Sequence, residues 1–366
     1  MTILILNWRD PKNPKAGGAE IATLEHAKVW IAHGHTVWWF SQSFKNAKLQ
    51  ENIEGVTIFR KGNFLVYFWA FLFYIKNKNK INAVVDEFHG LPYFSPLYVK
   101  KPILAFIHEV AGVIWDYMYP FPLNIIGKIL EPLFFIPYKT MPFITGANSA
   151  AEDLEKIGIP KKNITVIHHG VITIPVSENV KRENNPTYIF VNRLVKMKGV
   201  EDVLSAFKEI IVKQHEAKLW IVGSGEEKYV ASLKKMVSKN NLENSVKFWG
   251  FVSQKQKFEL YKKAHILLHA SVKEGWGLNV IEAASVGTPA IVYNVAGLKD
   301  AVKNNQTGIV LSLNNPTEMA YQATELLKNT EKYNQLSKNA KDWAKQFTWK
   351  RAGETSLMLI EKLAKK

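Results

Sequence analysis

The chain reads Glu274-Gly275-Trp276-Gly277-Leu278-Asn279-Val280-Ile281-Glu282 shortly after the apolar run 266–268. The apolar run predicts a strand and residues 278–286 predict a helix, so the stretch spans the turn between them. One carboxylate precedes the two glycines of the turn, and the other lies inside the helix. A helix start offers free N–H groups to an anion, and carboxylates accept hydrogen bonds from hydroxyls. The stretch therefore favours a ligand that carries both hydroxyls and phosphates, such as a sugar nucleotide.

The composition bounds the class of protein. The 366 residues suffice for two domains, and 47% are hydrophobic, so each domain can bury a core. A net charge of +16 favours polyanionic partners: nucleic acid, an anionic membrane surface or phosphorylated substrates. The absence of cysteine excludes disulfides, thiolate metal sites and cysteine nucleophiles, and it suits a reducing compartment.

Neither the start of the chain nor its longest apolar run predicts export or a membrane span. Residues 2–6 have no basic leader and no cleavage site, so we expect a first strand there and a cytoplasmic protein. The run 64–75 is shorter than the roughly twenty residues that a spanning helix needs. This run can lie in a membrane interface instead.

Strands and helices alternate along the whole chain, which predicts parallel α/β sheets. A polar segment, 175–186, interrupts the alternation and predicts a linker between two Rossmann-like domains. Strands are expected at 2–6, 36–40, 56–60, 83–85, 103–107, 143–147, 165–167, 188–191, 218–222, 246–249, 266–269, 290–293 and 308–310. Helices are expected at 21–32, 150–156 with Ser149 as N-cap, 278–286, 316–327, 333–345 and 351–363.

Basic residues and glycines follow three of these strands in the second half. Because ligands of open α/β sheets bind at the carboxyl ends of strands, the loops after Val191, Val222 and His269 should contact a ligand. Arg193 and Lys198 can clamp a diphosphate there, although a solvated basic loop would look the same. Gly223 permits close approach of a ligand to the backbone, but such glycines are also common for steric reasons.

The first half offers weaker candidates. Gly17 and Gly18 open a helix and can form an anion site, or simply a tight turn. His108 follows the strand 103–107 and can hydrogen-bond a sugar hydroxyl, or it is an ordinary loop residue. Five further side chains are candidates for the base that would accept a proton from the acceptor, and the sequence does not choose among them: Asp86, Glu87, His89, Asp116 and Glu131.

Two aromatic stretches lie beside lysines and suit contact with an anionic membrane. The alternative is that both helices pack on the sheet. The first stretch is 64–75, followed by Lys76, Lys78 and Lys80. The second is 115–138, which holds Tyr117, Tyr119, Phe121, Phe134 and Phe135 around Lys128.

Together these motifs resemble the retaining glycosyltransferases with the GT-B fold, in particular the large group with a Glu-x7-Glu signature known as glycosyltransferase family four. The resemblance covers nearly the whole chain, and its motifs are more specific in the second half. The matching residues are Gly17-Gly18-Ala19-Glu20, His108, Ala147-Asn148-Ser149, Val166-Ile167-His168-His169-Gly170-Val171, Asn192-Arg193-Leu194, Lys198-Gly199, Gly223-Ser224-Gly225, Glu274 through Glu282, and Phe347-Thr348-Trp349.

The resemblance implies a role for each matching residue. Arg193 and Lys198 would hold the donor diphosphate, and Glu274 would bond the hydroxyls of the donor sugar. Glu282 would hold the ribose hydroxyls, and His108 would lie near the sugar. The N–H groups of Gly275, Trp276, Gly277 and Leu278 would face the phosphates or the sugar, with Gly17, Gly18 and Gly223 also at the donor.

The resemblance also implies an organisation into an acceptor domain, 1–175, and a donor domain, 176–349, that face each other across a cleft. A final helix, 350–366, would pack back on the first domain. The chain departs from the family pattern at Asn192, Trp276 and His168-His169. None of these departures replaces a charged residue that would bind the donor, so they bear on which donor is used rather than on activity.

We expect a metal-independent, retaining transferase that uses a UDP- or GDP-sugar and a glycan or lipid-linked acceptor, peripheral at the inner face of the cell membrane. No Asp-x-Asp motif is evident, no cofactor is expected, and no carboxylate stands out as a covalent nucleophile. A sugar-nucleotide epimerase with the same architecture is the alternative enzyme. A nucleic-acid-binding protein is the non-enzymatic alternative; it is disfavoured because the basic residues are dispersed and no nucleic-acid module is evident.

Overall fold

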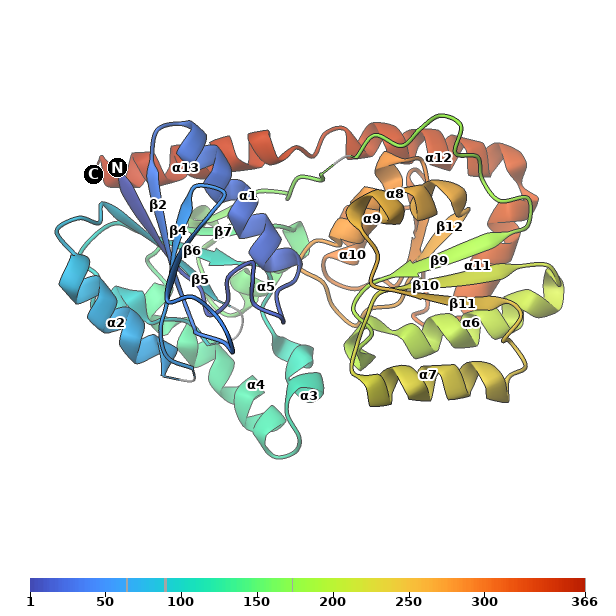
Figure 1. Ribbon diagram of the computed structural model, residues 1–366, viewed down its shortest axis with the longest axis horizontal. Coiled ribbons are helices and arrows are strands. Elements are labelled where there is room, and N and C mark those ends of the chain that lie inside the picture. Colours follow the sequence, from blue (N-terminus) through green and yellow to red (C-terminus); the bar gives the residue numbers. More distant parts are fainter. Residues whose placement is uncertain (64, 89–90, 173, 366) are drawn as a thin grey trace. The chain divides into compact units, whose positions relative to one another are not determined.

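A computed structural model describes residues 1–63, 65–88, 91–172 and 174–365. Phe64 and His89, two residues of the predictions above, lie outside these ranges. The chain forms two compact units, shown in Figure 1. The first consists of Met1–Gly170 and Phe347–Lys366, and the second is Val171–Gln346.

The first unit is built on an eight-stranded sheet in the order β3-β4-β2-β1-β5-β6-β7-β8. Neighbouring strands are parallel except β3 and β4, which form an antiparallel hairpin. Its strands are β1 (Thr2–Leu6), β2 (Thr36–Ser41), β3 (Gln50–Ile53), β4 (Val56–Arg60), β5 (Ala83–Phe88), β6 (Ile103–Ile107), β7 (Phe143–Thr145) and β8 (Ile164–Val166).

Helices surround this sheet, and the last helix of the chain is one of them. Helix α13 lies beside α1, where Gly353 allows close contact because a Cβ there would come within 2.4 Å of Val29 (Figure 1). The helices are α1 (Gly18–Ala32), α2 (Val66–Asn77), α3 (Trp115–Met118), α4 (Leu123–Phe134), α5 (Asn148–Lys156) and α13 (Trp349–Ala364), with short 3-10 turns at Ser95–Leu97, Gly112–Ile114, Ile136–Tyr138 and Lys161–Asn163.

The second unit is built on a six-stranded parallel sheet in the order β11-β10-β9-β12-β13-β14. Its strands are β9 (Thr187–Val191), β10 (Lys218–Val222), β11 (Val246–Gly250), β12 (Ile266–His269), β13 (Ala290–Val292) and β14 (Gly308–Val310). Its helices are η5 (Lys196–Lys198), α6 (Val200–Lys213), α7 (Glu227–Lys239), α8 (Gln254–Lys263), α9 (Leu278–Ser285), α10 (Leu298–Ala301), α11 (Pro316–Lys328) and α12 (Thr330–Ala344). In Figure 1, α6 and α7 lie on one face of the sheet and α8 and α9 on the other.

The boundaries between the units differ slightly from the predicted ones. The first crossing follows Gly170 rather than residue 175, because Gly170 packs against the backbone of Trp349, where a Cβ would come within 2.1 Å of the Trp349 nitrogen. The return crossing precedes Phe347, whose ring meets His168 edge-on. These contacts place both chain segments with the first unit.

Three local predictions are corrected by the structure. Strand β3 was missed because its sequence, Gln50–Ile53, is polar and forms only the sheet edge; the hairpin turn Glu54-Gly55 has positive φ at both residues. Helix α5 begins at Asn148 with Ala147 as N-cap, so the predicted Ser149 cap is wrong. Strand β5 continues through Asp86 and Glu87, which are fully buried rather than beyond the strand.

Candidate functional site

Strand β9 lies between β10 and β12, and the loops that follow these three parallel strands leave the same edge of the sheet. From β9 the strand order runs outward in one direction to β10 and β11, and in the other direction to β12, β13 and β14. Such a switch point is the usual ligand position of an open α/β sheet. The loop after β9 carries Arg193 and Lys198, the loop after β10 carries Gly223, and the loop after β12 carries Glu274.

Glu274 is the centre of a hydrogen-bond cluster at this edge. Lys198 Nζ lies 2.7 Å from Glu274 Oε1, and Ser271 donates to the same oxygen at 2.8 Å. The amide of Asn192 lies 3.4 Å from Oε1. Within the described residues, all three of these donors bond Oε1 rather than Oε2.

The electrostatics keep Glu274 ionised. Burial by itself would raise the pKa of Glu274, but Lys198, His269 and the hydrogen bonds from Lys198 and Ser271 outweigh it and lower the pKa to about 2. Burial lowers the pKa of His269 to about 4, so this ring is neutral at pH 7. The cluster therefore presents a carboxylate whose charge is balanced by Lys198.

Arg193 and Lys198 lie in different surroundings. The side chain of Arg193 is exposed, whereas Lys198 is buried at the end of η5. Gly199 follows with φ +69°, and a Cβ there would come within 2.1 Å of the Ala270 carbonyl oxygen. This close packing holds Lys198 against the loop after β12.

Gly223 permits an approach between two loops of the protein. Its φ is +136°, and a Cβ would come within 1.8 Å of the Asn192 carbonyl oxygen. Leu194 N–H donates to Ser224 O at 2.8 Å, so the loops after β9 and β10 are bonded directly. The steric explanation of this glycine is thus sufficient, and its contact with a donor stays a prediction.

The start of α9 is fixed to the same edge. Gly277, the N-cap, has φ +76°, and Asn279 Nδ2 donates to Val191 O, the last residue of β9, at 2.7 Å. The Trp276 side chain is buried, so Trp276 would contact a nucleotide sugar through its backbone N–H. The N–H groups of Gly275 through Leu278 stand where the helix begins, as an anion site requires.

Glu282 lies on α9 and is bonded by α8. Lys257 Nζ lies 2.7 Å from Oε1, and the Tyr261 hydroxyl donates to Oε2 at 3.2 Å. Sequence reasoning missed both partners, because a Lys and a Tyr one helical turn apart carry no recognisable motif.

In the first unit, the turn at Gly17 and Gly18 is occupied by a side chain of its own helix. Gly17 N–H donates to Glu20 Oε2 at 2.6 Å, and Arg9 Nε lies 2.9 Å from Glu20 Oε1. Asp10 is held in turn by the buried Arg60, with two bonds of 2.7 Å. The predicted anion site at Gly17 therefore already contains a carboxylate.

Both ring nitrogens of His108 contact other side chains. Its Nε2 lies 3.0 Å from Glu87 Oε1, and its Nδ1 lies 3.1 Å from His169 Nε2. Thr23 donates to the second oxygen of Glu87. Burial, followed by the charges of neighbouring histidines, lowers the pKa of His169 well below its usual value, so His169 is neutral. His169 is one of the departures from the family pattern, and it holds the His108 ring.

The other candidate bases of this unit have structural partners. Asp86 accepts hydrogen bonds from Tyr138 and from the N–H groups of Tyr93 and Ser95. Glu131 accepts from three N–H groups of the segment after His108: Ala111, Gly112 and the Trp115 indole. Asp116 pairs with Lys128 on α4.

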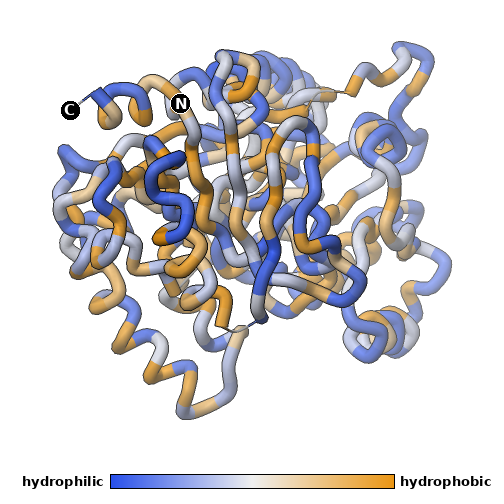
Figure 2. The backbone as a smooth tube through the Cα atoms, turned by 60° about the vertical axis from the view of Figure 1, so that its left-hand side comes forward, coloured by the Kyte–Doolittle hydropathy of each residue, from blue (hydrophilic) through white to orange (hydrophobic). Residues whose placement is uncertain are grey.

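Helices α3 and α4 carry a run of exposed apolar side chains and project from the first unit (Figure 1). Figure 2 colours this projecting segment orange over much of its length. Phe135, in contrast to the prediction for this stretch, is fully buried in the core. The exposed side chains of α3, α4 and the residues that adjoin them are Val113, Tyr117, Met118, Tyr119, Phe121, Leu123, Ile125, Ile126, Ile129, Leu130, Leu133 and Ile136.

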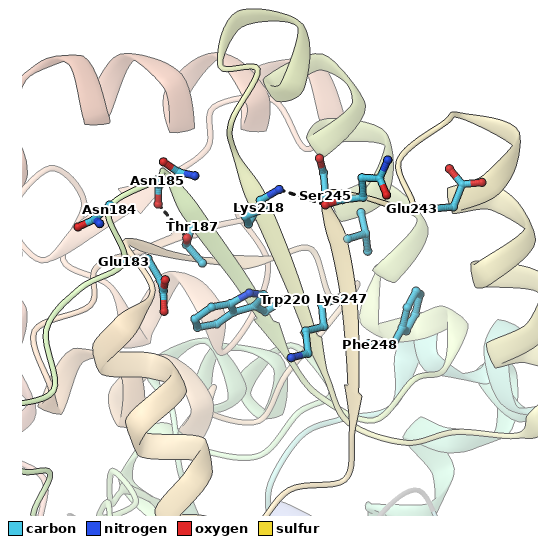
Figure 3. A pocket seen from close by; sticks show the side chains of 12 residues that line it. Glu183, Asn184, Asn185, Thr187, Lys218, Trp220, Glu243, Ser245, Lys247 and Phe248 are labelled. Carbon is cyan, nitrogen blue, oxygen red and sulfur yellow. Dashed lines mark hydrogen bonds between the residues drawn. The ribbon is translucent and has the colours of Figure 1, made fainter.

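A hollow of about 810 Å³ lies elsewhere in the second unit (Figure 3). Thr187, Lys218 and Val246, the first residues of β9, β10 and β11, line it, so it lies at the amino ends of the strands and not at the predicted donor loops. Among the described residues, no group of three or more His, Asp or Glu side chains could hold a metal ion. In the same part of the chain, no helix is long and apolar enough to cross a membrane.

Comparison with known proteins identifies the family. The model for Glycosyltransferase Family 4 matches residues 16–173, and the model for Glycosyl transferases group 1 matches residues 175–343. The chain belongs to the glycosyltransferase family that these two models together describe. The family resemblance and the predicted α/β GT-B fold are confirmed.

Three known proteins are similar to this glycosyltransferase in sequence or in fold. It is 25% identical to an uncharacterized glycosyltransferase of Methanocaldococcus jannaschii, MJ1607, over 95% of each chain. It shares its fold with sucrose-phosphate synthase from Thermosynechococcus elongatus, with a TM-score of 0.81 at 17% identity over 99% and 98% of the two chains. HepE of Anabaena, solved with UDP and glucose, gives a TM-score of 0.77 at 17% identity over 99% and 100%.

Proposed function

We propose that this glycosyltransferase transfers a sugar from a UDP- or GDP-sugar to a hydroxyl of a glycan or lipid-linked acceptor, with retention of anomeric configuration. The observation that carries the proposal is the cluster around Glu274, whose Oε1 is bonded by Lys198, Ser271 and Asn192. Oε2 can accept hydrogen bonds from sugar hydroxyls, while Lys198 supplies positive charge for the diphosphate. HepE of Anabaena, solved with UDP and glucose, supports this donor class.

The reaction develops negative charge on the departing nucleoside diphosphate. Lys198, the exposed Arg193 and the start of α9 supply positive charge and N–H donors at one edge of the sheet, so the proposal requires no metal ion. The acceptor oxygen bonds to the anomeric carbon as the bond to the phosphate oxygen breaks, and the acceptor proton passes to that phosphate oxygen. Attack is proposed on the face from which the diphosphate leaves; a trapped glycosyl-enzyme adduct would contradict it.

Donor binding tests the proposal directly. A ligand that binds only the folded protein raises its melting temperature, so UDP, GDP, ADP and their common sugars should be screened by thermal shift. We expect one nucleotide and its sugar nucleotide to stabilise the wild type, and Glu274→Gln to lose the additional stabilisation that the sugar gives. The matched control is Glu331→Gln, an exposed acid at the start of α12. Equal stabilisation of Glu274→Gln would refute the site.

Product analysis separates the transferase from its rivals. A transferase converts the donor rapidly only when an acceptor is present, and it releases a nucleoside diphosphate. Conversion of the donor sugar to its epimer without any acceptor would indicate an epimerase. A shift of labelled DNA or RNA at moderate salt, with no response to sugar nucleotides, would indicate a nucleic-acid-binding protein.

We further propose that α3 and α4 seat the protein on the inner face of the cell membrane, close to a lipid-linked acceptor. Phe121 is 82% exposed and Ile129 is 66% exposed, although both are large and apolar. Trp115 packs over Gly127, and Glu131 bonds the Trp115 indole, so the two helices form one rigid projection. Apolar helices with aromatic residues at their ends bind membrane interfaces, and a net charge of +16 favours anionic lipids.

Flotation with vesicles of phosphatidylcholine and phosphatidylglycerol tests membrane binding at low and high salt. We expect the wild type to float, and Ile129→Lys to remain unbound, because a charge would enter the apolar surface. Leu313→Lys is the matched control, since Leu313 is similarly exposed on the second unit. If the wild type stays unbound at both salt concentrations, the acceptor is not presented at a membrane through this surface.

A further inference from the structure

Both oxygens of Glu282 are held by side chains of the neighbouring helix. Lys257 and Tyr261 lie one turn apart on α8, and Figure 1 shows α8 beside α9. Lys257 Nζ contacts Oε1 at 2.7 Å and the Tyr261 hydroxyl contacts Oε2 at 3.2 Å. Tyr261 is fully buried, while the side chains of Lys257 and Glu282 remain 16% and 15% exposed. The carboxylate is thus fixed, yet still open to a ligand.

The Tyr261 hydroxyl acts as a hydrogen-bond donor toward Glu282. Burial, followed by the charge of Glu282, raises the pKa of Tyr261 well above its usual value, so the hydroxyl keeps its proton. Helix α8 is anchored near this residue, because Thr288 donates to Tyr261 O at 2.6 Å and Arg182 donates to Ala264 O. The positions of both donors are therefore set by the fold of the second unit.

A carboxylate held in this way suits a pair of vicinal hydroxyls. Each carboxylate oxygen accepts two hydrogen bonds, so one acceptor position remains on each oxygen after Lys257 and Tyr261 have bonded. We propose that Lys257 and Tyr261 are positioning residues that hold Glu282 in the orientation needed for the role that the family resemblance implies for it, which is to bind the 2′- and 3′-hydroxyls of the donor ribose. This inference rests on the proposed donor site.

The experiment compares ribose and deoxyribose in matched variants. Dissociation constants of UDP, GDP and ADP are measured calorimetrically, and the one that binds is compared with its 2′-deoxy form. A hydrogen bond to a charged group corresponds to roughly tenfold or more in affinity, so the wild type should prefer the ribonucleotide by that factor. In Tyr261→Phe and Lys257→Met this preference should fall several-fold, and KM for the donor should rise more than kcat falls. Lys255→Met, an exposed lysine of the same helix, should keep the wild-type ratio.

Each outcome bears on a separate statement. If both variants bind nucleotide with the full wild-type ratio, Lys257 and Tyr261 do not position Glu282. Equal wild-type affinity for both sugars would show that Glu282 does not read the ribose. If the wild type binds no nucleotide at all, the proposed function fails, and the inference fails with it. Ligand-free melting temperatures check folding; Tyr261→Phe keeps the buried ring, so it remains informative if Lys257→Met unfolds.

Discussion

The loops of the second unit differ from the histidine cluster of the first unit, formed by His108, His169 and Glu87, in whether the predicted residues bond one another. In the second unit, two residues predicted from the sequence, Lys198 and Glu274, bond each other directly at 2.7 Å. In the first unit, His108 instead bonds Glu87 and His169, and Gly17 bonds Glu20. A motif that supplies both partners can be interpreted from sequence, whereas a motif residue whose partner is an ordinary buried side chain cannot.

Breaking the Lys198–Glu274 pair gives the largest expected effect. Lys198→Met leaves a mostly buried carboxylate without its cation, which costs roughly 3 kcal/mol or more of unfolding free energy. Turnover should fall at least about a hundredfold, since charge stabilisation of the leaving group is lost. The double variant Lys198→Met/Glu274→Gln should recover most of the stability but none of the activity. Recovery of activity would contradict a role of the pair in catalysis.

Acid should weaken each unit through histidines whose pKa is lowered: His269 and His265 in the second unit, and His26 and His169 in the first. The folded-state pKa of His269 is lowered to about 4 and that of His26 to about 3, from an ordinary 6.5. The unfolded chain binds these protons first, so stability is complete above pH 6.5 and falls as the pH drops toward 4. The loss over this window is about 3 kcal/mol for each histidine. Denaturant unfolding measured between pH 7 and pH 4 checks it.

A variant that removes His269 sharpens this comparison. His269→Asn should reduce the pH dependence of the second unit, to which His265 with its pKa lowered to about 4 still contributes, while leaving that of the first unit in place. Below pH 4.5 the second unit should weaken further, because the lowered pKa of Glu274 makes its charge a source of stability that acid removes. An unchanged pH profile in His269→Asn would assign the acid sensitivity to other groups.

Glu87→Gln tests the histidine cluster with a smaller effect. An amide nitrogen in place of one carboxylate oxygen loses a charged hydrogen bond from either Thr23 or His108. The unfolding free energy should fall by about 1–3 kcal/mol, because the position is fully buried. If His108 acts at the donor sugar, kcat should also fall and its pH profile should shift. A loss of stability with an unchanged pH profile would make the cluster purely structural.

Gly17→Ala should give the smallest effect on folding. The backbone of Gly17 is extended, and an added Cβ would come no closer than 3.9 Å to Glu20 Oε2, so the stability change should stay within about 0.5 kcal/mol. A phosphate that approaches this turn closely would still meet the new methyl group, and KM for the donor would rise. Gly223→Ala provides the contrast, since its Cβ collides with Asn192 O and the fold itself should suffer. An unchanged KM in Gly17→Ala would remove this glycine from the donor site.

Much of the fold could be predicted because its signals are local. Apolar runs such as Ile103–Ile107 and Ile266–His269 were predicted with the bounds that the structure gives them. The polar edge strand Gln50–Ile53 was missed, since an edge strand buries little and carries no apolar pattern. In the candidate site, Glu274 and Glu282 lie eight positions apart and Arg193 and Lys198 lie five apart, so each pair is recognisable within one short stretch of the chain.

The sequence by itself determined two α/β units and the residues of the Glu274–Glu282 stretch. Only the tertiary structure decided what those residues contact: Lys257 and Tyr261 reach Glu282 from another helix, and His169 reaches His108 across many residues of chain. Periodicity and loop motifs depend on neighbours in sequence, and these can be read directly. Partners of a buried carboxylate or imidazole depend on which strands and helices become adjacent, and that follows from the packing of the whole unit.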